Sequence, residues 1–153
     1  MIEGPVDARS RKVAIVAARF NDFIVSSLLK GATGAWLERG GAAEDLLIAR
    51  VPGAFELPVA VRKLAAGGRY DAVVALGCVI RGGTPHFEYI SSECARGLQQ
   101  AGLDTGVPVI FGVLTADSVD QAIERAAVSA GNKGGEAMLA ALEMAALMAR
   151  LGS

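Results

Sequence analysis

The chain has 153 residues, of which 52% are hydrophobic and 20% are charged, and its formal net charge is -1. These proportions exclude a disordered chain, and the length suits a single domain with one core over residues 1–153. The charge leaves no cationic excess for nucleic acid, and no segment has the roughly 18 consecutive apolar residues of a membrane span. We therefore expect a cytoplasmic protein that binds neither nucleic acids nor membranes, with residues 1–11 forming an extended N-terminal arm.

Short apolar runs alternate with longer segments of helical pattern along the chain. In chain order, the expected elements are a strand over residues 13–17, a helix over about 24–39, a strand over 46–51, a helix from 55 or 56 to 67, a strand over 71–80, a helix over about 87–100, a strand over 107–113, and helices over about 118–130 and 136–151.

Polar and glycine residues mark the expected helix ends. Asn21 or Asp22 can cap the first helix, and residues 118–121 have the pattern of a capping box at the start of the fourth. Gly102 is expected to end the third helix, and Gly131 to break the chain between the last two.

The regular alternation of strands and helices predicts the fold class. Successive strand–helix–strand units give right-handed crossovers and a parallel sheet that is covered on both faces. We therefore expect an α/β fold, a three-layer sandwich in which a four-stranded parallel sheet of the flavodoxin-like kind is flanked by helices.

The last predicted helix is apolar nearly all round between residues 138 and 149. A surface helix of a monomer normally shows one apolar stripe. Met138, Leu142, Met144, Leu147 and Met148 are not expected to face one small core together, so the pattern predicts an interface between copies of the chain. The alternative is a fully buried terminal helix.

Residues suited to ligand binding follow each predicted strand. Ligands of open parallel sheets bind beyond the carboxyl ends of the strands. The residues at these positions are Phe20 and Asn21 after the first strand, Ala54, Phe55 and Glu56 after the second, Gly82, Gly83, Thr84 and His86 after the third, and Phe111 near the end of the fourth.

The glycine-rich turn after the third strand is a candidate phosphate site. The backbone N–H groups of Gly82 and Gly83, the Thr84 hydroxyl and the start of a helix together suit an anion. The turn lacks the lysine of a P-loop and the glycine spacing of a dinucleotide site. An ordinary glycine turn without a ligand is the alternative.

His86 is the only histidine in the chain. Histidine is the side chain whose proton exchange falls nearest neutral pH, and this one lies directly after the candidate phosphate turn, at a helix start. The positive end of the helix dipole there favours the neutral imidazole, which can act as a base. We interpret His86 as the proton-transfer residue.

Other side chains permit two interpretations. Arg125 and Lys133 could neutralise a phosphate or could be ordinary charges on the protein surface. Phe20, Phe55 and Phe111 could stack on a flat heterocycle or lie in the core. The two cysteines, Cys78 and Cys94, are expected to be packing residues, and no grouping of Cys and His suggests a metal site.

Together these segments resemble the 6,7-dimethyl-8-ribityllumazine synthase family. The resemblance extends from about residue 12 to residue 150, and the matching segments are residues 19–21, 52–58, 77–89 (with the motif Gly-Gly-Thr-Pro-His), 111–115, 121–126 and 130–134. It implies a transferase of riboflavin biosynthesis that condenses 5-amino-6-(D-ribitylamino)uracil with 3,4-dihydroxy-2-butanone 4-phosphate, releases phosphate and water, and needs no metal or organic cofactor.

The resemblance also implies roles for individual residues. His86 would shuttle protons, and Gly83, Thr84 and Arg125 would bind the phosphate. The residues implied to hold the ribitylaminouracil are Phe20, Asn21, Ala54, Phe55, Glu56, Cys78, Val79, Ile80, Phe111 and Lys133. Among them, Phe20 would stack on the pyrimidine, Glu56 would accept hydrogen bonds from the ribityl hydroxyls, and Phe111 would come from a neighbouring copy.

The implied assembly is a pentamer, twelve of which can close into a 60-subunit icosahedral shell, with riboflavin synthase as a candidate partner. Two other functions fit the same scaffold. An archaeal-type riboflavin synthase would use two lumazines, but the Gly-Gly-Thr-Pro-His loop favours a phosphorylated substrate. A non-catalytic shell or flavin-binding protein would not need His86 and Arg125.

Overall fold

The sheet at the centre of the molecule has four parallel strands. In a computed structural model that describes residues 1–152, the strand order is β2-β1-β3-β4, and the strands are β1 (Val13–Ala18), β2 (Leu46–Val51), β3 (Ala72–Ile80) and β4 (Val109–Ala116). The helices are α1 (Asp22–Glu38), α2 (Leu57–Ala66), α3 (His86–Thr105), α4 (Val119–Ala126) and α5 (Lys133–Leu151), and short 3-10 turns cover Ala43–Asp45 and Ala54–Glu56.

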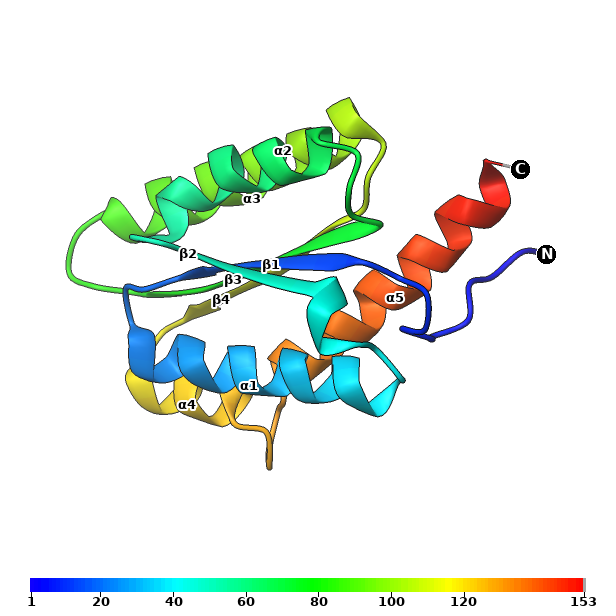
Figure 1. The fold of residues 1–153 in the computed structure, drawn as a ribbon. Coiled ribbons are helices and arrows are strands. Elements are labelled where there is room, and N and C mark those ends of the chain that lie inside the picture. The colour runs from blue at the N-terminus through cyan, green and yellow to red at the C-terminus, as the bar shows by residue number, and fades with distance from the viewer. Residues whose placement is uncertain (153) are drawn as a thin grey trace.

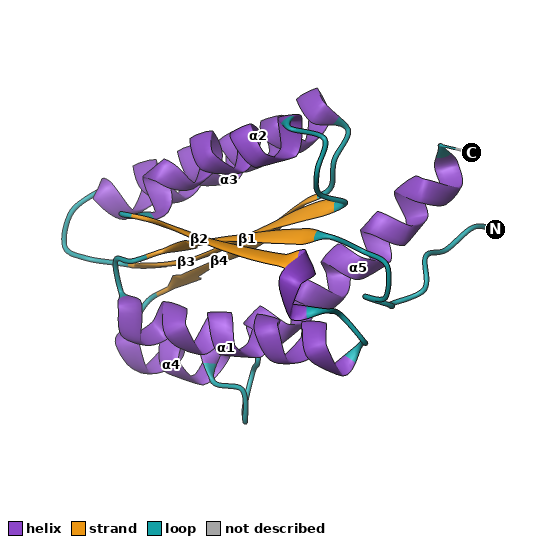
Figure 2. Ribbon diagram, in the orientation of Figure 1, coloured by secondary structure: helices purple, strands orange, loops and turns teal. Residues whose placement is uncertain are grey.

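Helices cover both faces of this sheet. Helices α2 and α3 lie on one face, and α1, α4 and α5 lie on the other (Figure 1). Figure 2 shows the same arrangement as an orange sheet between two purple layers. The predicted three-layer α/β sandwich is confirmed, and the strand order begins as in flavodoxin-like folds.

The two central strands supply side chains to both layers of core. Val13, Ile15 and Ala17 of β1 point into the core beneath α1, α4 and α5, whereas Ala14 and Val16 pack under α2 and α3. A strand that is buried on both faces has a continuous apolar sequence. This explains why the runs in β1 and β3 could be assigned from sequence.

Several predicted boundaries are wrong. Helix α3 passes through Gly102 to Thr105 and ends where Gly106 adopts a positive φ of 72°. Strand β4 covers Val109–Ala116 instead of residues 107–113. Pro108 lies just before the residues of β4 that pair with β3, and its carbonyl accepts a hydrogen bond from the Val73 N–H. Helix α4 ends at Ala126, ahead of the predicted break at Gly131.

The helix starts are closer to expectation. Ser118 accepts a hydrogen bond from the Gln121 N–H at 3.1 Å, as the predicted capping box requires, but the Gln121 side chain accepts its 2.7 Å hydrogen bond from the Asp117 N–H, one residue before the cap, instead of from Ser118. Helix α5 begins at Lys133, three residues before its predicted start, because the Asn132 side chain caps it by accepting from the Gly135 N–H.

Helix α5 is buried more deeply within one chain than its composition suggested. Met138 and Leu142 are fully buried against the sheet, but the other three large residues are not, so the five do not face one core together, as the sequence predicted. Met144 and Leu147 are half-buried, and Met148 is 37% exposed. The apolar surface left over therefore lies toward the C-terminal end of the helix.

Helices α1 and α5 approach each other closely at one glycine. A Cβ at Gly134 would lie 1.9 Å from the carbonyl oxygen of Leu28. Gly134 is therefore required for this contact, which joins the first and last helices of the chain.

Residues 1–12 form no helix or strand and run beside α5. Arg150 donates a hydrogen bond to the Glu3 carbonyl at 2.7 Å, and Gly4 lies against the backbone of Glu143. The two ends of the chain consequently lie on the same side of the molecule (Figure 1). No helix in the described part of the chain is long and apolar enough to cross a membrane.

Candidate active site

A cleft of about 790 Å³ opens at the carboxyl ends of β1, β2 and β3. Its walls come from the last residues of β3, from the segments that follow the three strands and from the first two turns of α3. The lining residues are Phe20, Asn21, Pro52, Gly53, Ala54, Phe55, Glu56, Cys78, Val79, Ile80, Gly82, Thr84, His86, Phe87, Tyr89 and Ile90. Eleven of the residues singled out by the sequence therefore surround one cavity.

The turn between β1 and α1 forms one side of this cleft. Asn21 adopts a left-handed conformation with a φ of 62°, and its side-chain amide donates a hydrogen bond of 2.9 Å to the Cys78 carbonyl. Asn21 occupies the cap position of α1 without a side-chain capping bond, so the predicted capping role is wrong. Its side chain instead ties the end of β1 to the end of β3.

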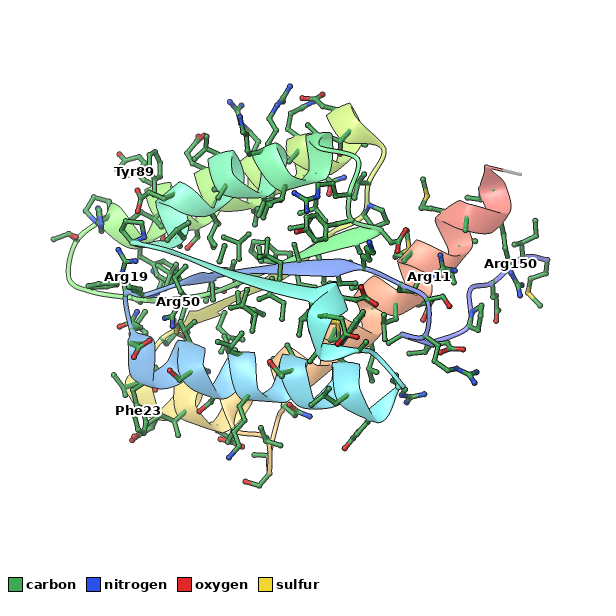
Figure 3. All side chains as sticks on the ribbon, in the orientation of Figure 1. Arg11, Arg19, Phe23, Arg50, Tyr89 and Arg150 are labelled. Carbon is green, nitrogen blue, oxygen red and sulfur yellow. The ribbon has the colours of Figure 1, made fainter. Side chains whose placement is uncertain are left out.

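A cation fixes the same turn from the other side. Arg50, near the end of β2, donates hydrogen bonds of 3.3 Å to the Ala17 and Ala18 carbonyls and forms a 2.6 Å ion pair with Asp22. This ion pair lowers the pKa of the Asp22 carboxyl group. Figure 3 shows Arg50, Arg19 and Tyr89 at the same end of the sheet.

Two aromatic rings stand in the cleft instead of in the core. Phe20 is 71% exposed and Phe55 is 59% exposed, and both line the cavity. The backbone N–H of Phe20 donates to the Pro52 carbonyl at 2.9 Å, so the segments that carry the two rings are joined by their backbones. Exposed rings in one cavity favour stacking on a flat ligand over a packing role.

Glu56 brings a negative charge to the same cavity. It is half-buried and ends the 3-10 turn after β2. Among residues 1–152, its carboxylate has no hydrogen-bond or ion-pair partner. A partly buried carboxylate of this kind can accept hydrogen bonds from ligand hydroxyl groups.

His86 is the first residue of α3, as the sequence predicted, and its side chain is exposed to the cleft. Gly82 and Thr84 line the cavity beside it, whereas Gly83 lies in the same exposed loop without lining it. The unpaired N–H groups at the start of this 20-residue helix provide partial positive charge at the loop. The arrangement can hold an anion next to a group that moves protons.

Neither cysteine is a candidate nucleophile. Both thiols are free and buried, and burial raises the pKa of Cys78 and of Cys94 to about 11. The thiols consequently stay protonated at neutral pH, which confirms their assignment as packing residues.

Three predicted site residues lie away from the cleft of a single chain. Phe111 is 48% exposed on the edge strand β4, where it pairs with Ala75. Arg125 donates a 3.0 Å hydrogen bond to the Thr115 carbonyl, and Lys133 forms a 3.2 Å ion pair with Glu136. None of the three lines the cavity.

Sequence reasoning missed the part of the site contributed by the body of α3. Phe87, Tyr89 and Ile90 line the cleft together with Pro52 and Gly53. Tyr89 and Ile90 are three and four residues beyond His86, so they share its face of the helix. This spacing from His86 is the feature of the sequence that could have identified Tyr89 and Ile90 as site residues.

The sequence matches a known protein family over most of its length. The model described as 6,7-dimethyl-8-ribityllumazine synthase matches residues 10–149. The match includes all four strands, the cleft and α3.

Proposed function

The chain belongs to the 6,7-dimethyl-8-ribityllumazine synthase family, a family of enzymes of riboflavin biosynthesis, and we propose that it condenses 5-amino-6-(D-ribitylamino)uracil with 3,4-dihydroxy-2-butanone 4-phosphate. The products are 6,7-dimethyl-8-ribityllumazine, phosphate and water. The observation that carries the proposal is that Phe20, Glu56, Thr84 and His86, from the segments that follow three different strands, line one cleft.

The heterocycle occupies the part of the cleft beside β1 and β2. Phe20 stacks on the pyrimidine with Phe55 nearby, and Glu56 accepts hydrogen bonds from the ribityl hydroxyls. Backbone groups of Cys78, Val79 and Ile80 face the ring edge. Support for this pose comes from the exposure of both phenylalanine rings and from the lack of a partner for the Glu56 carboxylate within the described chain.

The phosphate of the ketone occupies the start of α3. N–H groups of the Gly83 loop and the Thr84 hydroxyl donate to it, and Arg125 supplies the charge-assisted contact. Lys133 adds positive charge on the side of the ribitylaminouracil. The support is the position of Thr84 directly before a helix start that faces the cleft.

His86 moves protons between the reacting groups. The 5-amino nitrogen attacks the ketone carbonyl, and His86 helps to protonate the departing oxygen, so that water leaves as the imine forms. Phosphate then leaves by elimination, for which His86 removes the proton from the carbon that bears the hydroxyl group. The resulting enol takes up a proton on its terminal carbon and becomes a ketone. The ribitylamino nitrogen attacks this carbonyl, which closes the ring and releases a second water. Orientation of two substrates in one cavity can contribute about 7–11 kcal/mol to such a reaction.

The complete site is shared between neighbouring copies in a pentamer. Phe111 and Arg125 of one copy face Phe20 and Glu56 of the next, and twelve pentamers close into a 60-subunit shell, as the resemblance to the family implies. Two observations support a shared site. Phe111 projects from an edge strand with about half its surface exposed, and neither it nor Arg125 lines the cleft of its own chain.

Light scattering at neutral pH tests the assembly. Because one chain has a mass of 15.7 kDa, a closed shell should have a mass near 0.9 MDa (60 × 15.7 kDa) and a free pentamer a mass near 80 kDa (5 × 15.7 kDa). We expect the shell. A monodisperse, fully active monomer would contradict the shared site, because Phe111 and Arg125 would then be absent from the cleft.

The reaction is tested by mixing the purified protein with both substrates. We expect the fluorescent lumazine and inorganic phosphate to appear in equal amounts, and neither product to form when one substrate is left out. Conversion of the lumazine alone to riboflavin would indicate a riboflavin synthase instead. Flavin binding without turnover of either substrate set would indicate a non-catalytic protein.

A further inference from the structure

Arg81 lies at the start of the loop that carries Thr84 and His86. It directly follows β3, and its backbone N–H donates a 2.8 Å hydrogen bond to the Ala116 carbonyl at the end of β4. The loop therefore leaves the sheet from a fixed point. The loop of residues 82–85 ends at the start of α3, and Phe87, the second residue of that helix, lines the cleft.

The Arg81 side chain connects this starting point to both neighbouring segments. Its Nη1 lies 3.2 Å from Oε1 of Glu88 in the first turn of α3, and its Nε lies 3.0 Å from Oδ1 of Asp117 in the β4–α4 turn. The guanidinium carbon lies 4.6 Å from the centroid of the Phe87 ring. One planar group thus contacts two residues of the first turn of α3, directly beyond the loop, and one residue of the β4–α4 turn.

The charges of this cluster argue against a direct role in phosphate binding. Two carboxylates surround one guanidinium, so the group of Arg81, Glu88 and Asp117 has a net negative charge. An anion would be repelled by the carboxylates and would have to displace them. The guanidinium is better suited to hold protein segments together.

We propose that Arg81 is a positioning residue that closes the loop of residues 82–85 by pairing with Glu88 and Asp117, and thereby holds Thr84 and His86 in place. Each ion pair alone is partly exposed and weak. Together with the ring contact, the two ion pairs fix the distance between the end of β3 and the first turn of α3 and also fix the plane of the guanidinium group. A lysine, which has no planar group, could not reproduce this arrangement. The catalytic consequence rests on the proposed function, whereas the closure of the loop does not.

The test replaces Arg81 with methionine in the full chain and measures hydrogen exchange of the amides of residues 82–88. We expect exchange to accelerate there and to remain unchanged in the sheet. We also expect kcat/KM to fall about tenfold, since small misplacements of reacting groups can cost up to about 10²-fold. The melting temperature and the particle mass should stay close to wild type, because the loop is exposed.

Arg62→Met is the matched control. Arg62 pairs with Asp104 and joins α2 to the far end of α3, so this variant also removes an ion-paired arginine that connects two elements. Exchange in residues 82–88 and kcat/KM should be unchanged in it. Arg81→Lys should fall between the wild type and Arg81→Met.

Two further variants separate positioning from direct binding. Asp117→Asn should reproduce part of the Arg81→Met effect, and the double variant should be little worse than Arg81→Met alone. Arg125→Met should weaken inhibition by inorganic phosphate about tenfold or more and leave exchange of the loop unchanged.

Unchanged loop exchange in Arg81→Met would overturn the inference. So would an Arg81→Met variant that behaves as Arg125→Met does, because Arg81 would then bind the phosphate itself. If the wild-type protein fails to form the lumazine while Arg81→Met still accelerates loop exchange, the proposed function fails and the closure of the loop stands.

Discussion

His86→Ala is expected to lower kcat about 10²-fold. General acid–base groups contribute about 10²- to 10⁴-fold, and the low end applies because orientation of the two substrates supplies much of the rate. The side chain is exposed at the start of α3, so its removal leaves the core intact. Steady-state kinetics with both substrates between pH 6 and pH 8 measure the effect.

Three further readouts isolate proton transfer from damage to the fold. Particle mass, melting temperature and binding of the pyrimidine alone should be the same in His86→Ala and in the wild type. Added imidazole should restore part of the lost turnover, because the vacated place is open to solvent. Equal turnover of the two proteins across this pH range would remove His86 from the mechanism.

Gly134→Ala is expected to destabilise the protein by about 3 kcal/mol, because overpacking that forces a backbone shift reaches the upper end of the usual range. The new Cβ would lie 1.9 Å from the Leu28 carbonyl oxygen, so α1 and α5 must move apart. For a chain of this length the melting temperature should fall by about 6–12 °C. Thermal unfolding at a fixed protein concentration measures it.

Gly34→Ala provides the control within the same pair of helices. Gly34 lies inside α1, and a Cβ there would meet no atom within 4 Å. Alanine is the better helix former, so this variant should be more stable than the wild type by about 0.5–1 kcal/mol. If Gly134→Ala melts at the temperature of Gly34→Ala or above it, the close contact of α1 and α5 does not limit stability.

The fold could be predicted because burial on both faces leaves a direct trace in the sequence. The continuous apolar runs of β1 and β3 have no other simple explanation. No comparable pattern in the sequence marks the end of α4 at Ala126. Residues 127–130 are Ala-Val-Ser-Ala, which helices tolerate, so the sequence predicts the break only at Gly131.

The cleft could be predicted for a topological reason, and its supporting contacts could not. The carboxyl ends of parallel strands meet at one edge, which brought Phe20, Glu56 and His86 together as expected. The link from Asn21 to the Cys78 carbonyl joins residues 57 positions apart. The pair of Arg81 and Asp117 spans 36 positions, and no local pattern signals either contact.

The neighbouring ends of the chain have a practical consequence for engineering. Because Arg150 contacts Glu3, a short linker could join the two termini, and the chain could be reopened at an exposed turn as a circular permutant. Both termini lie at the end of the sheet remote from the cleft (Figure 1). A fusion partner or affinity tag attached to either of them would therefore leave the entrance of its own chain's cleft unobstructed.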